Sequence, residues 1–121
     1  MSTLKVGTIQ DTSGNNSSTP SEVAQGRAKA WVNFNGTGTV AIREDFNVSS
    51  ITDNATGQYT VTFTNAMADA NFSFAVSGIK LLDNGVDGGG RQTPTSTTLK
   101  ISFLDLTNFT DVDFASVVIF R

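Results

Sequence analysis

A strict alternation marks Tyr59-Thr-Val-Thr-Phe63, in which each large apolar residue is separated from the next by a threonine. A period of two places the apolar side chains on one face of a β-strand and the threonines on the other face. The same period runs through Ala28-Lys-Ala-Trp-Val-Asn-Phe34, and Asn35-Gly36 follows with the residues that a tight turn requires. The sequence therefore predicts a hairpin, with a return strand over residues 38–42.

Further strands are predicted in the C-terminal half of the chain. Apolar and polar residues alternate over 72–76 and 99–103, and the last strand is predicted over 112–120. About seven short strands, with turn residues between them and no long segment of helical period, favour an all-β fold, an antiparallel β-sandwich. Because most of the nine phenylalanines fall at apolar positions of these strands, we expect most of them in the core.

The chain divides near Arg27 into two parts of different composition. Residues 1–26 contain few large apolar side chains and include a stretch, residues 11–20, made of Asp, Thr, Ser, Gly, Asn and Pro. This part cannot bury a core alone, so we expect an extended N-terminal arm over 1–26 and a β-sandwich domain over 27–121. Within the arm, Thr19-Pro-Ser-Glu22 has the residue order of a helix start, and Gly26 is placed to end that helix.

Composition excludes several kinds of chemistry. The chain of 121 residues has no Cys and no His, so disulfides, Cys/His metal centres, thiol nucleophiles and imidazole catalysis are impossible. The net charge of −3 gives no basic stripe for nucleic acid, and no apolar run reaches the roughly 18 residues of a membrane span. The N-terminus lacks the apolar core of a signal peptide, which predicts synthesis and folding in a cytoplasm. We expect no enzyme, no cofactor and no metal.

Two groups of acidic residues could in principle carry chemistry that needs neither Cys nor His. Asp111 and Asp113 fall on one face if they lie on a strand, at a separation that touches the range of an inverting glycosidase. Solvated surface charge is the favoured interpretation, because nothing nearby marks a cleft or a raised pKa. The loop over residues 82–95 has Asp and Asn among glycines, but Pro94 stands where a calcium-binding loop places its glutamate.

That loop also holds the candidates for ligand contact. Binding residues concentrate on long loops of rigid scaffolds, so Asp83, Asn84, Asp87 and Arg91 are the candidate receptor-contact residues.

Three residues are candidates for a subunit interface: Trp31, Val117 and Ile119. Residues 117–120 are apolar at every position, which predicts that both faces of the last strand are covered, by a loop or by another subunit. Trp31 points away from the apolar face of its strand. Its indole is expected to pack against another protein, beneath another part of this chain, or on a sugar ring.

Several segments of the sequence resemble known proteins. Residues 27–43, reading Arg-Ala-Lys-Ala-Trp-Val-Asn-Phe-Asn-Gly-Thr-Gly-Thr-Val-Ala-Ile-Arg, together with 46–54 and 57–63, resemble a module of tail-fibre and other virion proteins of tailed bacteriophages, the aquatic phage type. The opening Ser2-Thr-Leu-Lys-Val-Gly-Thr-Ile-Gln-Asp-Thr-Ser-Gly14 is similar to N-termini of phage structural proteins. These segments cover about half of the chain, and residues beyond about Ser77 match nothing in that module.

The resemblance implies a virion protein, assembled in the host cytoplasm, that binds rather than reacts. The first interpretation is a short homotrimeric tail fibre, anchored to other virion structural proteins through Leu4, Val6 and Ile9, whose β-domain contacts a host surface glycan or protein. The alternative is a capsid cement or decoration protein that stabilises the shell. A glycan depolymerase is the enzymatic alternative, and the missing His argues against it.

Overall fold

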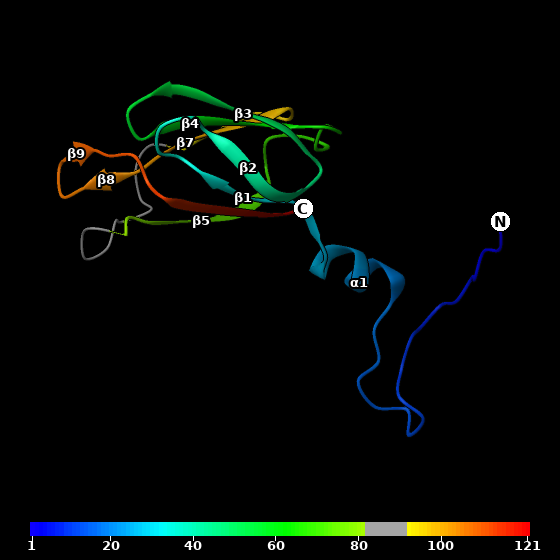
Figure 1. The fold of residues 1–121 in the computed structure, drawn as a ribbon. Coiled ribbons are helices and arrows are strands. Elements are labelled where there is room, and N and C mark those ends of the chain that lie inside the picture. The colour runs from blue at the N-terminus through cyan, green and yellow to red at the C-terminus, as the bar shows by residue number, and fades with distance from the viewer. Residues whose placement is uncertain (82–91) are drawn as a thin grey trace.

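The computed structural model of the chain, which describes residues 1–81 and 92–121, shows the predicted all-β sandwich of two antiparallel sheets (Figure 1). The first sheet has the strand order β2 (Ala41–Phe46), β1 (Ala28–Asn35), β10 (Phe114–Phe120), β5 (Ser73–Ile79). The second sheet has the order β3 (Val48–Ala55), β4 (Gln58–Phe63), β7 (Thr98–Ser102), β6 (Thr93–Pro94). A two-stranded hairpin, β8 (Leu104–Asp105) and β9 (Asn108–Phe109), lies beside them.

The first and last strands of the sandwich are neighbours at the centre of the first sheet. β1 pairs with β2 in the predicted hairpin and with β10 on its other side, both antiparallel. In this register Trp31 lies opposite Phe46 on β2 and opposite Val118 on β10. Because a directly opposed pair shares one face of a sheet, these three side chains lie together on the outer face.

The core is filled by the inward-facing residues of both sheets. Tyr59, Val61 and Phe63 are buried on β4, as the alternation predicts, and Leu99 and Ile101 are buried on β7 beside them. Aromatic rings pack edge to face at both ends, Phe34 on Tyr59 at 5.2 Å and Phe63 on Phe72 at 5.8 Å between ring centroids.

The phenylalanines divide between the core, where most of them lie as expected, and the surface. Phe34, Phe63, Phe72 and Phe103 are buried and Phe74 is partly buried, but four of the nine are exposed, namely Phe46, Phe109, Phe114 and Phe120. The core is therefore complete without them.

The chain crosses from the first sheet to the second at Asn47. This residue has a φ of 57°, in the left-handed region that asparagine tolerates better than most residues. Its side-chain amide donates to the carbonyl oxygens of Lys29 and Asn65 at 3.0 and 3.1 Å, and its carbonyl oxygen accepts from the Asn65 amide N–H at 2.8 Å. One side chain thus holds β1, the corner and the end of β4 together.

At the opposite end of the strands, Tyr59 connects the two sheets. Its hydroxyl lies 2.7 Å from the Gly36 carbonyl oxygen and 2.9 Å from Asp111 Oδ1, so the single O–H group is the hydrogen-bond donor for both oxygens. A Cβ at position 36 would lie 2.6 Å from that hydroxyl, so a glycine is required there. Burial, followed by the hydrogen bond to Asp111 and the charge of that carboxylate, raises the pKa of Tyr59 well above its usual range.

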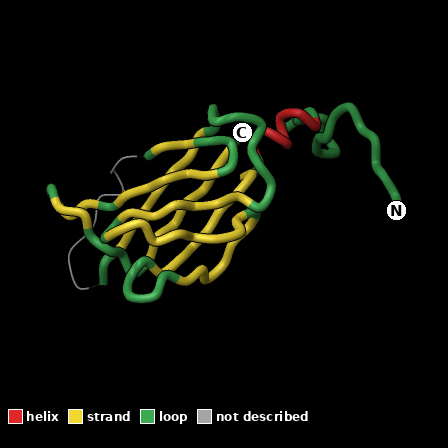
Figure 2. Tube along the Cα trace, turned by 90° about the horizontal axis from the view of Figure 1, so that it is seen from above, coloured by secondary structure: helices red, strands yellow, loops and turns green. Residues whose placement is uncertain are grey.

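The N-terminal residues lie apart from the sheets, and only helix α1 (Pro20–Gly26) gives them regular structure (Figure 2). The predicted helix start is confirmed. Thr19 accepts from the backbone N–H of Glu22 at 3.2 Å, while the Glu22 carboxylate accepts from the backbone N–H of Thr19 at 2.6 Å. Residues 1–17 are all exposed, and one backbone bridge, Ile9 to Ser18, folds the segment back on itself.

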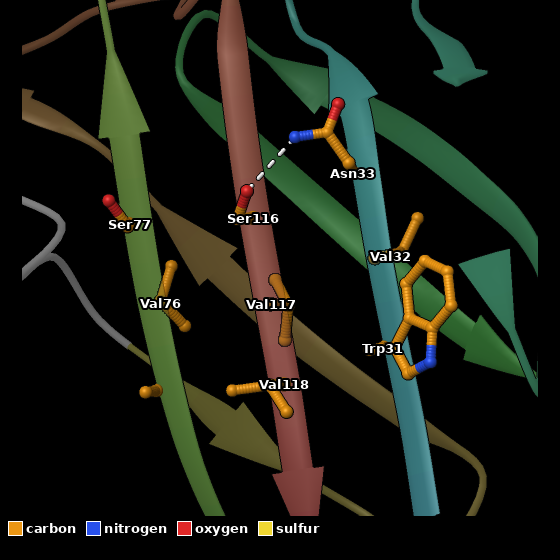
Figure 3. Close-up of a pocket in the computed structure, with 9 residues that line it drawn as sticks. Trp31, Val32, Asn33, Val76, Ser77, Ser116, Val117 and Val118 are labelled. Carbon is orange, nitrogen blue, oxygen red and sulfur yellow. Dashed lines mark hydrogen bonds between the residues drawn. The ribbon is translucent and has the colours of Figure 1, made fainter. Parts of the chain in front are cut away.

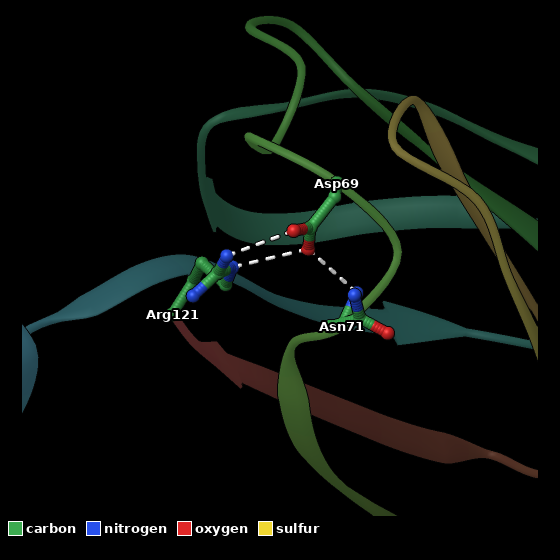
Figure 4. A network of polar contacts seen from close by, with 3 residues as sticks. All are labelled: Asp69, Asn71 and Arg121. Atoms are coloured by element: carbon green, nitrogen blue, oxygen red, sulfur yellow. Dashed lines mark hydrogen bonds and ion pairs between the residues drawn. The ribbon is translucent and has the colours of Figure 1, made fainter.

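The C-terminal residue is tied to the loop between β4 and β5 (Figure 4). Arg121 donates from Nε and from one terminal nitrogen to the two oxygens of Asp69, at 3.2 and 2.9 Å. Asp69 also accepts from the Asn71 backbone N–H at 2.7 Å. Because both charged groups are well exposed, this pair adds little to stability.

Candidate functional site

The outer face of the first sheet carries an apolar surface that the described residues leave largely exposed. We call it the apolar face, and its large side chains are Trp31, Phe46, Ile79, Phe114, Val118 and Phe120. Trp31 is 37% exposed and Phe46 51% exposed, and they lie opposite each other on neighbouring strands. Large apolar groups exposed together in this way are typical of a protein contact surface.

The centre of the apolar face is hollowed. A depression of about 320 Å³ lies over β10 between Trp31 on one side and β5 on the other, and the outward side chains beneath it are small (Figure 3). Val118 and Ala75 are opposed in its floor, and Ser116 and Ser77 form the next opposed pair. Asn33 donates to the Ser116 hydroxyl at 3.0 Å, so two of the polar side chains at this end are already hydrogen-bonded to each other (Figure 3). The hollow fits an apolar side chain better than a polar ligand.

Arg43 lies across another part of the apolar face. Its guanidinium carbon is 4.0 Å from the centroid of the Phe114 ring, and one terminal nitrogen donates to the Asp113 carbonyl oxygen at 2.6 Å. A cation in this position covers part of an aromatic ring that solvent would otherwise contact.

Of the three predicted subunit-interface residues, only Trp31 is on the surface. Val117 and Ile119 are 3% and 1% exposed, and they point into the core of a single chain. The prediction for these two residues is wrong, since a second subunit cannot contact side chains that the sandwich already encloses. The outward-facing members of β10 are Phe114, Ser116, Val118 and Phe120.

The structure brings the three predicted anchor residues together. Leu4, Val6 and Ile9 line one groove of about 520 Å³, whose other wall is formed by α1 and includes Val23. All four apolar side chains are exposed, Leu4 to 85%. The predicted receptor-contact residues Asp83, Asn84, Asp87 and Arg91 lie outside the described residues.

The carboxylates of Asp111 and Asp113 hold loops in place. Asp111 accepts from the Gly57 N–H at 2.7 Å and from Tyr59, while Asp113 accepts from the Leu81 N–H at 2.8 Å. β10 begins at Phe114, so these two residues precede the strand on which their shared face was predicted. Each carboxylate binds the backbone of a different loop, an arrangement suited to fixing loops rather than to acid–base catalysis.

The outer face of the second sheet is polar. Its threonine-rich rows include Thr52, Thr60 and Lys100 as directly opposed residues on β3, β4 and β7. A cleft of about 300 Å³ lies at one end of this face, beside the β8–β9 hairpin. The sequence did not single out this cleft, because its residues come from β3, β4, β6, β7 and β9 and meet only through strand pairing.

Within residues 1–81 and 92–121, no cluster of three or more acidic side chains is placed to hold a metal ion. No helix among those residues is long and apolar enough to cross a membrane. No family model matches the chain, and comparisons with curated proteins and with solved structures find no match.

Proposed function

We propose that this protein is a virion structural protein of a tailed bacteriophage, most simply a short trimeric tail fibre. In this proposal the N-terminal residues attach to another virion protein, copies of the β-domain associate through the apolar face, and the rest of the domain contacts the host. The observation that carries the proposal is the apolar face, which remains exposed although the core of the single chain is complete.

Self-association is supported by the composition of the apolar face. Aromatic side chains are enriched in the cores of protein interfaces, and tryptophan is among the residues that most often dominate binding energy. The apolar face exposes four aromatic side chains: Trp31, Phe46, Phe114 and Phe120. The hollow beside Trp31 offers a place for an apolar side chain of a neighbouring copy. Burying such groups contributes roughly 25 cal/mol per Å² of apolar surface, before the cost of association.

Attachment is supported by the N-terminal groove. Leu4, Val6 and Ile9 expose their apolar side chains together, and α1 offers too little surface to bury them. A partner that adds a strand or an apolar ridge would bury them at once. The resemblance of residues 2–14 to phage structural proteins favours a virion protein as that partner.

The first experiment measures the solution mass by light scattering coupled to size exclusion. The full-length chain and a chain beginning at Arg27 are both expected to be trimers. Val118→Asp and Trp31→Ser are expected to give monomers, since a charge or a lost indole removes the apolar contact. Thr62→Asp, an outward substitution on the second sheet, is the matched control and is expected to leave the trimer intact.

The outcomes separate the two structural roles. A wild-type monomer at every concentration would overturn the fibre and favour a decoration protein that is ordered on its particle. A trimer that loses its incorporation into phage particles when residues 1–26 are removed supports the anchor, and unchanged incorporation would contradict it.

A further inference from the structure

The polar cleft on the second sheet combines chemical groups that suit one class of ligand. Its lining comprises Asn54, Gln58, Tyr59, Thr93, Lys100, Ile101, Ser102 and Phe109. The volume of about 300 Å³ is at the lower end of the range of about 300–1,000 Å³ for small-molecule sites. The cleft therefore has room for a small ligand or for the end of a longer one.

The floor of the cleft presents side-chain amides and an ammonium group. Gln58 and Lys100 make no side-chain hydrogen bond with any described residue, so both are available to a ligand. Asn54 donates from its amide nitrogen to the Thr60 hydroxyl at 2.8 Å, which fixes the amide and leaves its carbonyl oxygen as an acceptor. Amides that offer both donors and acceptors match the vicinal hydroxyls of a sugar.

An aromatic ring stands at one end of the cleft. Phe109 lies on β9, held opposite Leu104 by the short hairpin, and is 45% exposed. Its ring gives the cleft a flat apolar wall next to polar groups. The C–H face of a sugar ring packs against such a wall, while the hydroxyls at its edge reach the amides.

The charge of the cleft narrows the class of sugar. Among the described residues that line it, Lys100 is the one charged group, and none of these side chains is a carboxylate. A bound anion would therefore meet a cation and no opposing charge. A single cation without a cluster of backbone N–H groups is a weak match to a nucleotide, whose phosphates need several donors.

We propose that this cleft binds an anionic saccharide, with the sugar ring on Phe109, hydroxyls on Gln58 and Asn54, and the anionic group on Lys100. The inference rests on the proposed function in one respect, since a host-facing β-domain is what brings a surface polysaccharide to the cleft. The site lies on the opposite sheet from the apolar face, so association leaves it open.

The test is a titration of the full-length protein followed by amide chemical shifts, with trigalacturonate and uncharged maltotriose as probes. Trigalacturonate is expected to shift the amide signals of Gln58, Lys100 and the β8–β9 hairpin, and to bind at least about tenfold more tightly than maltotriose. Lys100→Gln is expected to remove that preference. Phe109→Ala is expected to weaken both ligands by about threefold to tenfold, and Thr62→Ala, outside the cleft, to change neither.

The outcomes on the wild-type protein decide the proposal whether or not a variant folds. Absence of shifts at the cleft, shifts confined to the apolar face, or equal affinity for the two probes would each overturn it. The mass measurement above tests the proposed function independently. A trimer that binds neither saccharide would overturn the saccharide site and leave the proposed fibre standing. A monomer that binds trigalacturonate would support the saccharide site and overturn the fibre.

Discussion

The two outer faces of the sandwich use the same strand pattern and carry opposite chemistry. Across the first sheet, one row of directly opposed residues is apolar from edge to edge: Phe46, Trp31, Val118, Ala75. Across the second sheet, the corresponding kind of row is polar throughout: Thr52, Thr60, Lys100, Thr93. A threonine on a strand face is compatible with water. An indole exposed beside an exposed phenyl ring is unfavourable in water, and its burial against another surface would lower the free energy. The contrast separates a face built for contact with protein from a face built for water and polar ligands.

The largest expected effect tests where the boundary between core and apolar face lies. Ile119→Ala removes a side chain that is 1% exposed and is expected to lower the free energy of unfolding by about 2–5 kcal/mol. The neighbouring Val118→Ala, on the outward side of the same strand, is expected to cost well under half as much. Urea unfolding at two protein concentrations measures both. If the loss of unfolding free energy for Ile119→Ala depended on protein concentration, Ile119 would belong to the subunit interface after all.

The next prediction concerns the hydroxyl that connects the two sheets. Tyr59→Phe leaves the Gly36 carbonyl and the Asp111 carboxylate without their shared donor, which is expected to cost about 1–3 kcal/mol. The raised pKa of Tyr59 means that the folded state holds the phenol proton more tightly than the unfolded state does. This contribution to stability is fully present below the ordinary tyrosine pKa near 10 and is lost as pH rises above it.

Because Tyr59 is the sole tyrosine, ultraviolet absorbance reports its ionisation directly. Tyrosinate is expected to appear only as the protein unfolds at alkaline pH, and Tyr59→Phe is expected to flatten the alkaline fall in stability relative to wild type. Ionisation near pH 10 in a protein that stays folded would contradict the buried hydrogen bonds.

Sequence periodicity predicted the sandwich and the outward direction of Trp31, but it assigned the last strand to the wrong faces. The strand predicted over 112–120 includes Asp113, and counting by twos from this outward-facing residue sends Val117 and Ile119 outward. In the structure Val112 and Ala115 are both buried, three residues apart, because the strand begins only at Phe114. The alternation therefore restarts at Phe114, and no local sequence signal shows where it does so.

Phe46 was missed for a related reason. Ile42 lies opposite Phe34 and faces the core, while Glu44 lies opposite Asn33 on the outer face. Residues that are two positions apart on a regular strand would share a face. A bulge that leaves Arg43 unpaired causes this change and sends Phe46 outward beside Trp31. The composition of the second-sheet cleft escaped prediction too, since register between strands distant in sequence brings its residues together.

A smaller effect is expected where Arg43 covers part of the apolar face. Arg43→Ala removes the guanidinium from the Phe114 ring and is expected to lower the unfolding free energy by about 0.5–1 kcal/mol. It also exposes more of that ring, so self-association is expected to strengthen rather than weaken. Sedimentation velocity across a dilution series measures this. Lys100→Ala, which removes a cation from the polar face instead, is the matched control and is expected to leave association unchanged. Weaker association of Arg43→Ala would show that the guanidinium itself takes part in the contact.

The smallest expected effect lies at one end of the strands, where Arg121, after β10, pairs with Asp69 in the loop between β4 and β5. The backbone N–H of Asn71, and then the Arg121 guanidinium, hold the pKa of Asp69 below its usual range. The carboxylate therefore contributes stability above the ordinary aspartate pKa near 4, and this is lost as pH falls through the lower folded pKa. Asp69→Asn is expected to lower Tm slightly at pH 7 and to leave a smaller difference from wild type as the pH falls, as calorimetry at several pH values would show. Since both groups face water, a large loss of Tm, or a change in oligomer mass, would mean that this corner belongs to the contact surface of the apolar face rather than to its solvated margin.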